Sequence, residues 1–149
     1  KKLKKNINIE LLKKKILDNK VFFLGICVGM QILSDFGYEN KTSKGLSIIN
    51  GNVKKLNTKE ILPHVGWNSL NFKNQNKIFD GISDKTDFYF THSYTFELKN
   101  SLNEIAFTNY GVKFSSAINK QNIFGTQFHP EKSQSPGIKL IKNFLELKI

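Results

Sequence analysis

The sequence contains no arginine and only one cysteine among its 149 residues. A single cysteine excludes an internal disulfide framework and is typical of a reducing compartment. No stretch approaches the roughly 18 to 20 apolar residues that a membrane span needs, and no secretory signal pattern opens the chain. We therefore predict a cytoplasmic protein with no membrane segment.

The formal net charge of +11 would suit a nucleic-acid-binding protein. All 23 basic residues are lysine, however, whereas arginine makes the bidentate contacts typical of phosphate and base recognition. The lysines are also spread along the chain, apart from clusters within residues 1–5 and 13–15. We interpret them as solvated surface residues and predict no nucleic-acid partner. Three histidines and one cysteine without ligand spacing predict no metal site.

The chain, residues 1–149, fits one domain with enough apolar residues for a core. Apolar residues at helical spacing predict an amphipathic helix between residues 6 and 19. The apolar run Val21–Leu24 predicts a buried parallel strand, and Gly29–Phe36 predicts a helix that ends at Gly37. Cys27 stands in the sharp turn between that strand and that helix.

Short strands separated by turn signals are predicted for the middle of the chain. A final helix is predicted with Pro136 near its start and Ile138, Ile141, Phe144 and Leu145 on one apolar face. These elements predict an α/β fold whose sheet is parallel around the strand at Val21 and antiparallel in its extension. The predicted middle strands are Gly51–Leu56, Glu60–Pro63, Gly66–Phe72, Asp87–Thr95, Ile105–Thr108, Val112–Ile118 and Ile123–Phe128.

The run Gly25-Ile26-Cys27-Val28-Gly29 has the form G-x-C-x-G of a nucleophile elbow. Both glycines are expected to avoid collisions in a tight turn that forces Cys27 into a strained backbone conformation. A position at a helix N-terminus is expected to lower the thiol pKa. The alternative is a buried cysteine between glycines that serve packing.

A second run, from Gln127 to Glu131, places a histidine and a glutamate two residues apart after a predicted strand. A nucleophilic thiol needs a base, and the base needs a group that fixes its tautomer. His129 and Glu131 could fill these two roles for Cys27. The alternative is an ordinary surface or core histidine, since the spacing alone does not establish contact with the thiol.

Together these runs resemble class I (triad) glutamine amidotransferases, through Leu24–Gln31 and Gln127–Glu131. The match covers the chain from Val21 to its end. It implies a flavodoxin-like three-layer sandwich with a mixed sheet and a parallel core. Further segments resemble the glutaminase subunit of imidazole glycerol phosphate synthase, namely Leu62–Asn68, Phe88–Tyr94, His129–Ser133 and Gly137–Phe144.

The resemblance implies a cofactor-free glutaminase in which Cys27 attacks the amide of L-glutamine, His129 transfers the proton and Glu131 orients His129. Glu39 would hold the α-ammonium group of glutamine. The α-carboxylate or backbone of glutamine would be held by Gln31 and by the backbone around His92, Ser93 and Tyr94.

The same resemblance implies a heterodimer with a (β/α)₈-barrel cyclase subunit that receives the ammonia for histidine biosynthesis. Four residues fall near that interface in the family: Trp67, Asn68, Tyr89 and Lys132. His64 has no catalytic interpretation, and a structural role is expected for it.

The family carries an oxyanion-hole loop upstream of the nucleophile strand, and nothing before Val21 resembles it. Since the chain also begins with lysine, we expect an N-terminal part to be absent, which leaves the activity of this chain open. Three alternatives stay open as well. They are a paralogous subunit for amidino-sugar biosynthesis, a truncated non-catalytic partner of the barrel, and a cysteine peptidase or γ-glutamyl hydrolase on the same fold.

Overall fold

The computed structural model describes residues 8–18 and 20–148. Within these residues no helix is both long and apolar enough to cross a membrane. The helices are α1 (Ile9–Ile16), α2 (Val28–Gln31) and α3 (Gln134–Leu145), with 3₁₀ turns η2 (Lys77–Phe79), η3 (Ser101–Asn103) and η4 (Pro130–Lys132).

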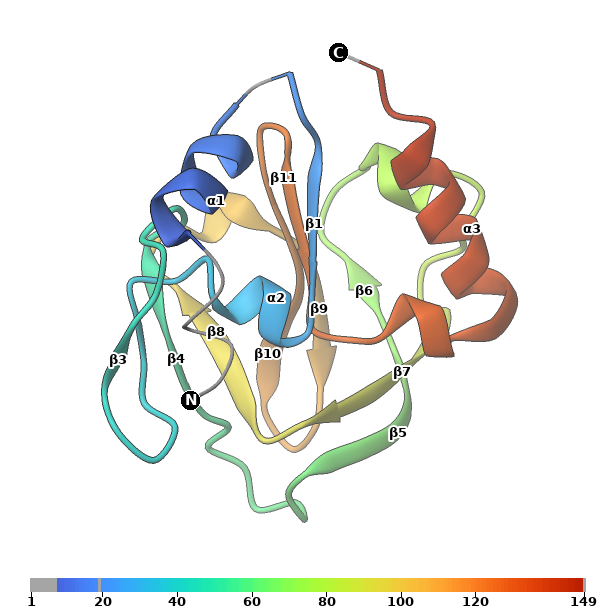
Figure 1. The fold of residues 1–149 in the computed structure, drawn as a ribbon. Helices are drawn as coiled ribbons and strands as arrows, with labels where there is room; N and C mark the ends of the chain where they lie inside the picture. The colour runs from blue at the N-terminus through green and yellow to red at the C-terminus, as the bar shows by residue number, and fades with distance from the viewer. Residues whose placement is uncertain (1–7, 19, 149) are drawn as a thin grey trace.

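The strands form three sheets (Figure 1). In the largest sheet β1 pairs with β11 in parallel, and the other pairings are antiparallel. The order of this sheet is β1 (Phe23–Ile26), β11 (Ile123–Thr126), β10 (Lys113–Lys120), β9 (Glu104–Asn109) and β6 (Asn71–Phe72). A second sheet has the order β3 (Ser43–Lys44), β2 (Phe36–Gly37), β4 (Gly51–Lys55) and β8 (Tyr94–Leu98), and β5 (His64–Ser69) pairs with β7 (Asp87–His92).

Alternation of side chains along the largest sheet creates a core on each of its faces. Ala117 belongs to one buried cluster and its neighbour Ile118 to the other. Leu140 of α3 joins the cluster of Ala117, whereas Ile16 of α1 and Met30 of α2 join the cluster of Ile118. Helices therefore cover opposite faces of the sheet, with α1 and α3 on opposite sides of β1 and β11 in Figure 1. The predicted α/β class and mixed sheet are confirmed.

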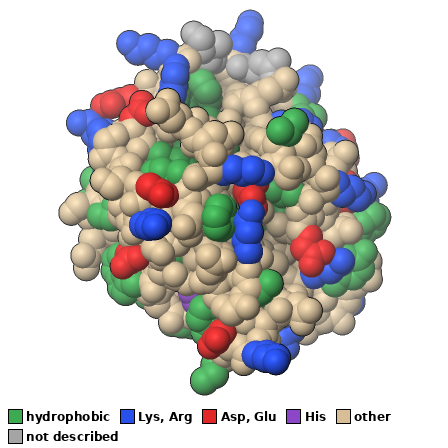
Figure 2. Space-filling model, turned by 180° about the vertical axis from the view of Figure 1, so that it is seen from behind, with side chains coloured by type: hydrophobic (Ala, Val, Ile, Leu, Met, Phe, Trp, Pro, Cys, Tyr) green, Lys and Arg blue, Asp and Glu red, His purple; other side chains and the backbone are tan. Residues whose placement is uncertain are grey.

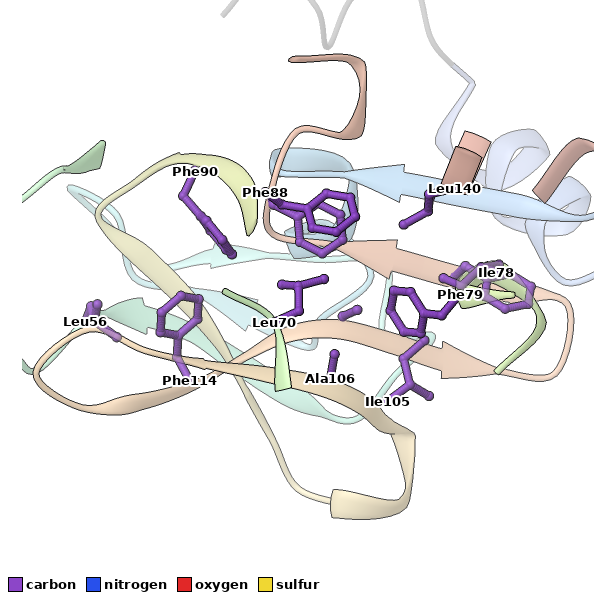
Figure 3. Close-up of a cluster of buried hydrophobic side chains, with 13 residues drawn as sticks. Leu56, Leu70, Ile78, Phe79, Phe88, Phe90, Ile105, Ala106, Phe114 and Leu140 are labelled. Atoms are coloured by element: carbon purple, nitrogen blue, oxygen red, sulfur yellow. The ribbon is translucent and has the colours of Figure 1, made fainter. Parts of the chain in front are cut away.

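The core on the α3 side is rich in phenylalanine, as Figure 3 shows. Phe88 and Phe90 of β7 are fully buried and both pack against Phe128, with ring centroids 4.5 and 5.8 Å apart. Since Phe128 directly precedes His129, this packing anchors the segment that carries the predicted base.

The predicted helix over Gly29–Phe36 is wrong in its length, since α2 ends at Gln31 and Phe36 begins β2. The carbonyl groups of residues 32–34 accept hydrogen bonds from the backbone of residues 46–49. These non-local bonds replace the next helical turn. Gly37 lies in β2 and does not end the helix.

Two other predictions need correction. Glu60–Pro63 forms no strand, because side-chain bonds from Thr58 and Tyr110 hold this segment instead. In α3, Ile138 and Leu145 are 69% and 74% exposed. The buried positions of α3 are Gly137, Leu140 and Asn143.

Most other predicted elements are present with shifted ends. Residues 6, 7 and 19 of the predicted first helix lie outside the described residues, and the observed α1 is shorter. The predicted strand Gly66–Phe72 is divided between β5 and β6, and Asp87–Thr95 between β7 and β8. Lysine side chains are scattered between acidic and apolar ones over the face seen in Figure 2 and do not gather in one patch.

Candidate functional site

The parallel pairing of β1 and β11 brings the two predicted motifs to the same edge of the sheet. Ile26 stands opposite Thr126 in the register, so the chain leaves both strands at one end. The backbone N–H of Cys27 donates to the Thr126 carbonyl over 2.7 Å. Cys27 and Gln127 therefore follow neighbouring strand ends, and His129 lies two residues further on.

Cys27 occupies a strained elbow, with φ 51° and ψ −107° at the N-cap of α2. A Cβ added to Gly25 would lie 2.3 Å from the carbonyl oxygen of Gly29, so only glycine fits at position 25. The prediction that both glycines avoid collisions is wrong for Gly29, where an added Cβ meets nothing within 4 Å.

The thiol of Cys27 is half-buried between two polar groups. Its Sγ lies 3.6 Å from Nε2 of Gln127, which donates to it, and 4.0 Å from the carbonyl oxygen of Thr91. Burial raises the pKa of the Cys27 thiol, and the nearby Glu131 charge adds to this rise. The backbone N–H of Val28 lowers the pKa but does not prevail. The start of α2 therefore lowers the thiol pKa as predicted, but desolvation is the larger effect and the net pKa is raised.

His129 is oriented by Glu131, whose Oε1 lies 2.6 Å from Nδ1 of the imidazole. The other ring nitrogen, Nε2, is buried and has no hydrogen-bond partner among the described residues. Glu131 accepts the proton of Nδ1, so the lone pair of the neutral ring is on Nε2. No hydrogen bond joins Nε2 to the sulfur of Cys27 in the described structure.

Strand β7 holds the histidine segment through its backbone. The N–H of His129 donates to the Tyr89 carbonyl over 2.9 Å. The N–H of Tyr89 donates to the hydroxyl of the buried Ser133, which itself donates to the His129 carbonyl over 2.6 Å. Because three hydrogen bonds fix the segment, the position of the imidazole depends on β7 as well as on β11.

A hollow of about 210 Å³ adjoins the elbow. Val28, which follows Cys27, lines it together with Gln31 and Glu39. The hollow also contains Lys44, so it presents one carboxylate and one ammonium group. The structure thus brings the predicted residues Gln31 and Glu39 to one cavity, which Val28 connects to the elbow.

Several polar groups of Gln31 and of the other predicted glutamine-binding residues make hydrogen bonds within the molecule. Both N–H groups of the Gln31 amide are used, by the Tyr94 carbonyl and by Gln127, each at 3.1 Å. The His92 imidazole is buried against His64, with 3.0 Å between the two ring nitrogens. The side chains of Gln31 and His92 are thus engaged within the molecule, and binding of glutamine by the backbone around His92, Ser93 and Tyr94 stays a prediction.

Of the four predicted interface residues, Trp67 and Lys132 are exposed, and Asn68 and Tyr89 are half-buried. Trp67 is 47% exposed and packs edge to face on Tyr89, its register partner on β7, with ring centroids 6.0 Å apart. Lys132 in η4 is exposed. Asn68 uses its side chain for internal bonds, to the Asn109 carbonyl and to His64.

Sequence reasoning missed Gln127 as a partner of the thiol, although it lies within the quoted histidine motif. It also missed Ser133 and the contact between His64 and His92. Only the folded chain joins these residues, since His64 and His92 lie on different strands. Across residues 8–18 and 20–148, no three His, Cys, Asp or Glu side chains are grouped as ligands for a metal ion.

The family model for class-I glutamine amidotransferases matches residues 4–147. The chain therefore belongs to the class-I glutamine amidotransferase family. Within the family it is of the HisH type. It is 46% identical over 142 residues to "Imidazole glycerol phosphate synthase subunit HisH" of Pelagibacter ubique, covering 93% of this chain and 68% of that protein. The subunit of the same name from Methanocaldococcus jannaschii is 50% identical, covering 89% of this chain and 67% of that protein.

Solved structures share the fold. A glutamine amidotransferase crystal structure matches with a TM-score of 0.67 at 17% identity, covering 93% of this chain and 66% of the other. A glutamine amidotransferase of Thermotoga maritima matches with a TM-score of 0.62 at 21% identity, covering 91% of this chain and 52% of the other. The chain thus spans about two thirds of the curated relatives and about half to two thirds of these structures.

Proposed function

We propose that this chain is the glutaminase subunit of a cytoplasmic imidazole glycerol phosphate synthase, with Cys27, His129 and Glu131 as its catalytic residues. One observation carries the proposal: the parallel β1–β11 pair delivers the strained cysteine and the His129–Glu131 pair to one sheet edge. The names of the relatives supply the reaction, and the lone cysteine fits a reducing compartment.

In the resting site the thiol is protonated at neutral pH, because burial raises the pKa of Cys27. Nε2 of His129 takes the thiol proton as Sγ attacks the side-chain amide carbon of glutamine. The mechanism requires Sγ and Nε2 to come together on substrate binding, as catalytic contacts often tighten only in the complex. Glu131 stabilises the imidazolium that forms.

The imidazolium then gives its proton to the departing nitrogen, so that ammonia leaves and a γ-glutamyl thioester remains on Cys27. His129 next removes a proton from water, which attacks the thioester. Glutamate leaves and the thiol is restored. Each turnover thus consumes one glutamine and one water and releases one glutamate and one ammonia.

The hollow beside Val28 is proposed as the site that binds the α-ammonium and α-carboxylate groups of glutamine. Free glutamine carries an ammonium and a carboxylate, and Glu39 and Lys44 line the hollow with the opposite charges. The backbone around Ser93 and Tyr94 remains a further candidate for the α-carboxylate.

We also propose that ammonia passes to a (β/α)₈-barrel cyclase subunit that docks over Trp67, Tyr89 and Lys132. Strand β7 supports this, since it carries Tyr89 toward the exposed Trp67 and fixes His129 by its backbone. A partner on this face would lie close to the site that releases ammonia. In the alternative function, amidino-sugar biosynthesis, the chain would dock on a paralogous barrel subunit instead.

The proposal is tested by glutamate release from glutamine, measured with and without a barrel cyclase subunit. Cys27→Ala should abolish release, while Leu145→Ala on the exposed face of α3 should not change it. If the wild-type chain binds the barrel and releases no glutamate, the non-catalytic partner is correct instead. Stimulation only by an amidino-sugar barrel would assign the paralogous pathway.

A further inference from the structure

The amide of Asn68 has an orientation that the backbone fixes. Its Oδ1 accepts from the Ser69 N–H over 2.9 Å, and its Nδ2 donates to the Asn109 carbonyl over 2.9 Å. The same Nδ2 lies 3.3 Å from Nε2 of His64. Since Nδ2 can only donate, Nε2 of His64 must accept, and the proton of a neutral His64 lies on Nδ1.

His64 passes this polarity to His92. Its Nδ1 donates to Nε2 of His92 over 3.0 Å, so the proton of His92 lies on its own Nδ1. That nitrogen is 2.9 Å from the Tyr94 carbonyl, which can only accept. The backbone groups at the two ends of this series thus require the same pair of tautomers.

Both imidazoles are held neutral by their surroundings. Burial lowers the pKa of His64 to about 4 and also lowers the pKa of His92. The titratable groups facing them are each other, His129 near His92, and Tyr110, whose ring stacks on His64 with centroids 4.0 Å apart. A second proton on either ring would place two N–H groups face to face, so the series has one stable polarity.

The Tyr94 carbonyl connects the histidines to the thiol. It also accepts from Nε2 of Gln31, which donates its second hydrogen to Oε1 of Gln127. With its oxygen so engaged, the fully buried Gln127 directs Nε2 at Sγ of Cys27, 3.6 Å away. The series of donors that starts on strand β5 and the series that ends at the nucleophile therefore meet at the Tyr94 carbonyl, which accepts from both.

We propose that Gln127 is a positioning residue that stabilises the Cys27 thiolate, and that a buried relay holds it in place and links it to strand β5. This inference rests on the proposed function only because the thiolate is the nucleophile there. Since β5 also carries the exposed Trp67, a partner that moves β5 would change the donor at Cys27. The buried relay consists of Asn68, His64, His92, the Tyr94 carbonyl, Gln31 and Gln127.

The test is the rate of Cys27 alkylation by iodoacetamide as a function of pH, measured on the full chain. Gln127→Leu should slow alkylation at pH 7 about tenfold, because a hydrogen bond to a charged group is lost. Asn68→Leu, at the far end, should slow it about threefold, and the double variant should be no slower than Gln127→Leu alone. An unchanged rate in Asn68→Leu, or additive effects in the double variant, would overturn the relay.

Asn143→Leu is the matched control. Asn143 is a buried asparagine, and like Asn68 it donates from Nδ2 to backbone carbonyls, here those of Ile78 and Asp80, outside the relay. This variant should lose thermal stability and keep the wild-type alkylation rate. If it slows alkylation as much as Asn68→Leu does, general loosening explains the effect and the relay is wrong.

Asn68→Asp gives a second readout that does not depend on how well Asn68→Leu folds. Its carboxylate cannot donate, so it should draw a proton onto Nε2 of His64. NMR should then show that His64 titrates between pH 5 and 8, which it should not do in the wild type. Wild-type titration of His64 in this range would contradict the tautomers.

Alkylation needs no glutamine turnover, so an inactive glutaminase with the predicted rates would refute the proposed function and leave the relay intact.

Discussion

Glu131 supports the base His129 but disfavours the thiolate form of Cys27. It holds Nδ1 of His129 at 2.6 Å, which the proposed proton transfer requires, and its charge raises the pKa of Cys27. One substitution should therefore separate turnover from thiol reactivity.

In Glu131→Gln, glutamine turnover should fall by about a hundredfold or more, because the histidine loses the carboxylate that fixes its tautomer and stabilises its charge. Iodoacetamide alkylation of Cys27 at pH 7 should become faster, because the thiol pKa falls. Steady-state kinetics and alkylation rates measure the two effects. Parallel losses in both would show that Glu131 acts on the structure of the elbow instead.

His64 links pH to stability. Its pKa is about 4 in the folded chain against 6.5 ordinarily, so the unfolded chain takes up a proton first as the pH falls. The contribution of neutral His64 to stability is complete above pH 6.5 and is lost as the pH falls from 6.5 to 4. Urea unfolding should show a loss on the order of 1 to 2 kcal/mol over this window, and His64→Gln should show a smaller loss. Equal slopes would mean that the pKa of His64 is the same in the folded and the unfolded chain.

At the scale of elements, the two glycines of the elbow look alike in sequence but differ in their surroundings, since only Gly25 is crowded. Gly25→Ala should destabilise the fold by about 2 to 3 kcal/mol or more, because its Cβ would meet the backbone of Gly29 and Met30. Gly29→Ala should keep wild-type stability, because its Cβ meets open space and alanine favours a helix. Thermal unfolding of the two variants measures this. A Gly29→Ala loss as large as that of Gly25→Ala would disprove the described packing.

How far the elements could be predicted depends on how local their causes are. The strand before Cys27 and the strand before Gln127 follow from short apolar runs, and the turn between strand and helix follows from G-x-C-x-G. The early end of α2 could not be predicted, because it depends on residues 46–49 taking the carbonyl groups of residues 32–34. The exposed side of α3 was mistaken for the same reason. Gly137 permits close approach to Pro130, and this contact decides which face is buried.

The same distinction applies to the site. The residue types in the motifs indicated Cys27, His129 and Glu131, because each role demands a particular side chain. The roles of Gln127 and Asn68 could not be found in this way. An amide has no reactive signature, and its function depends on which partner fixes its orientation in the folded chain.

At the scale of the whole molecule, the Trp67 face is predicted to bind the barrel partner. Trp67→Ala should weaken binding to a barrel cyclase subunit by about 2 kcal/mol or more, since large exposed aromatics commonly dominate interfaces. Its thermal stability should change little, because half of the side chain is already exposed. Isothermal calorimetry can measure this, with Ile138→Ala on the exposed face of α3 as the control. Equal affinities of Trp67→Ala and the wild type would move the interface elsewhere.

The central claim is that Cys27 and His129 act together on glutamine. The most direct measurement is covalent labelling by a chloroketone analogue of glutamine, located by peptide mass spectrometry. The account predicts a single label on Cys27, slowed by excess glutamine, absent in Cys27→Ala and at least about tenfold slower in His129→Ala. Labelling of Cys27 at the same rate with and without the imidazole, or unaffected by glutamine, would contradict it.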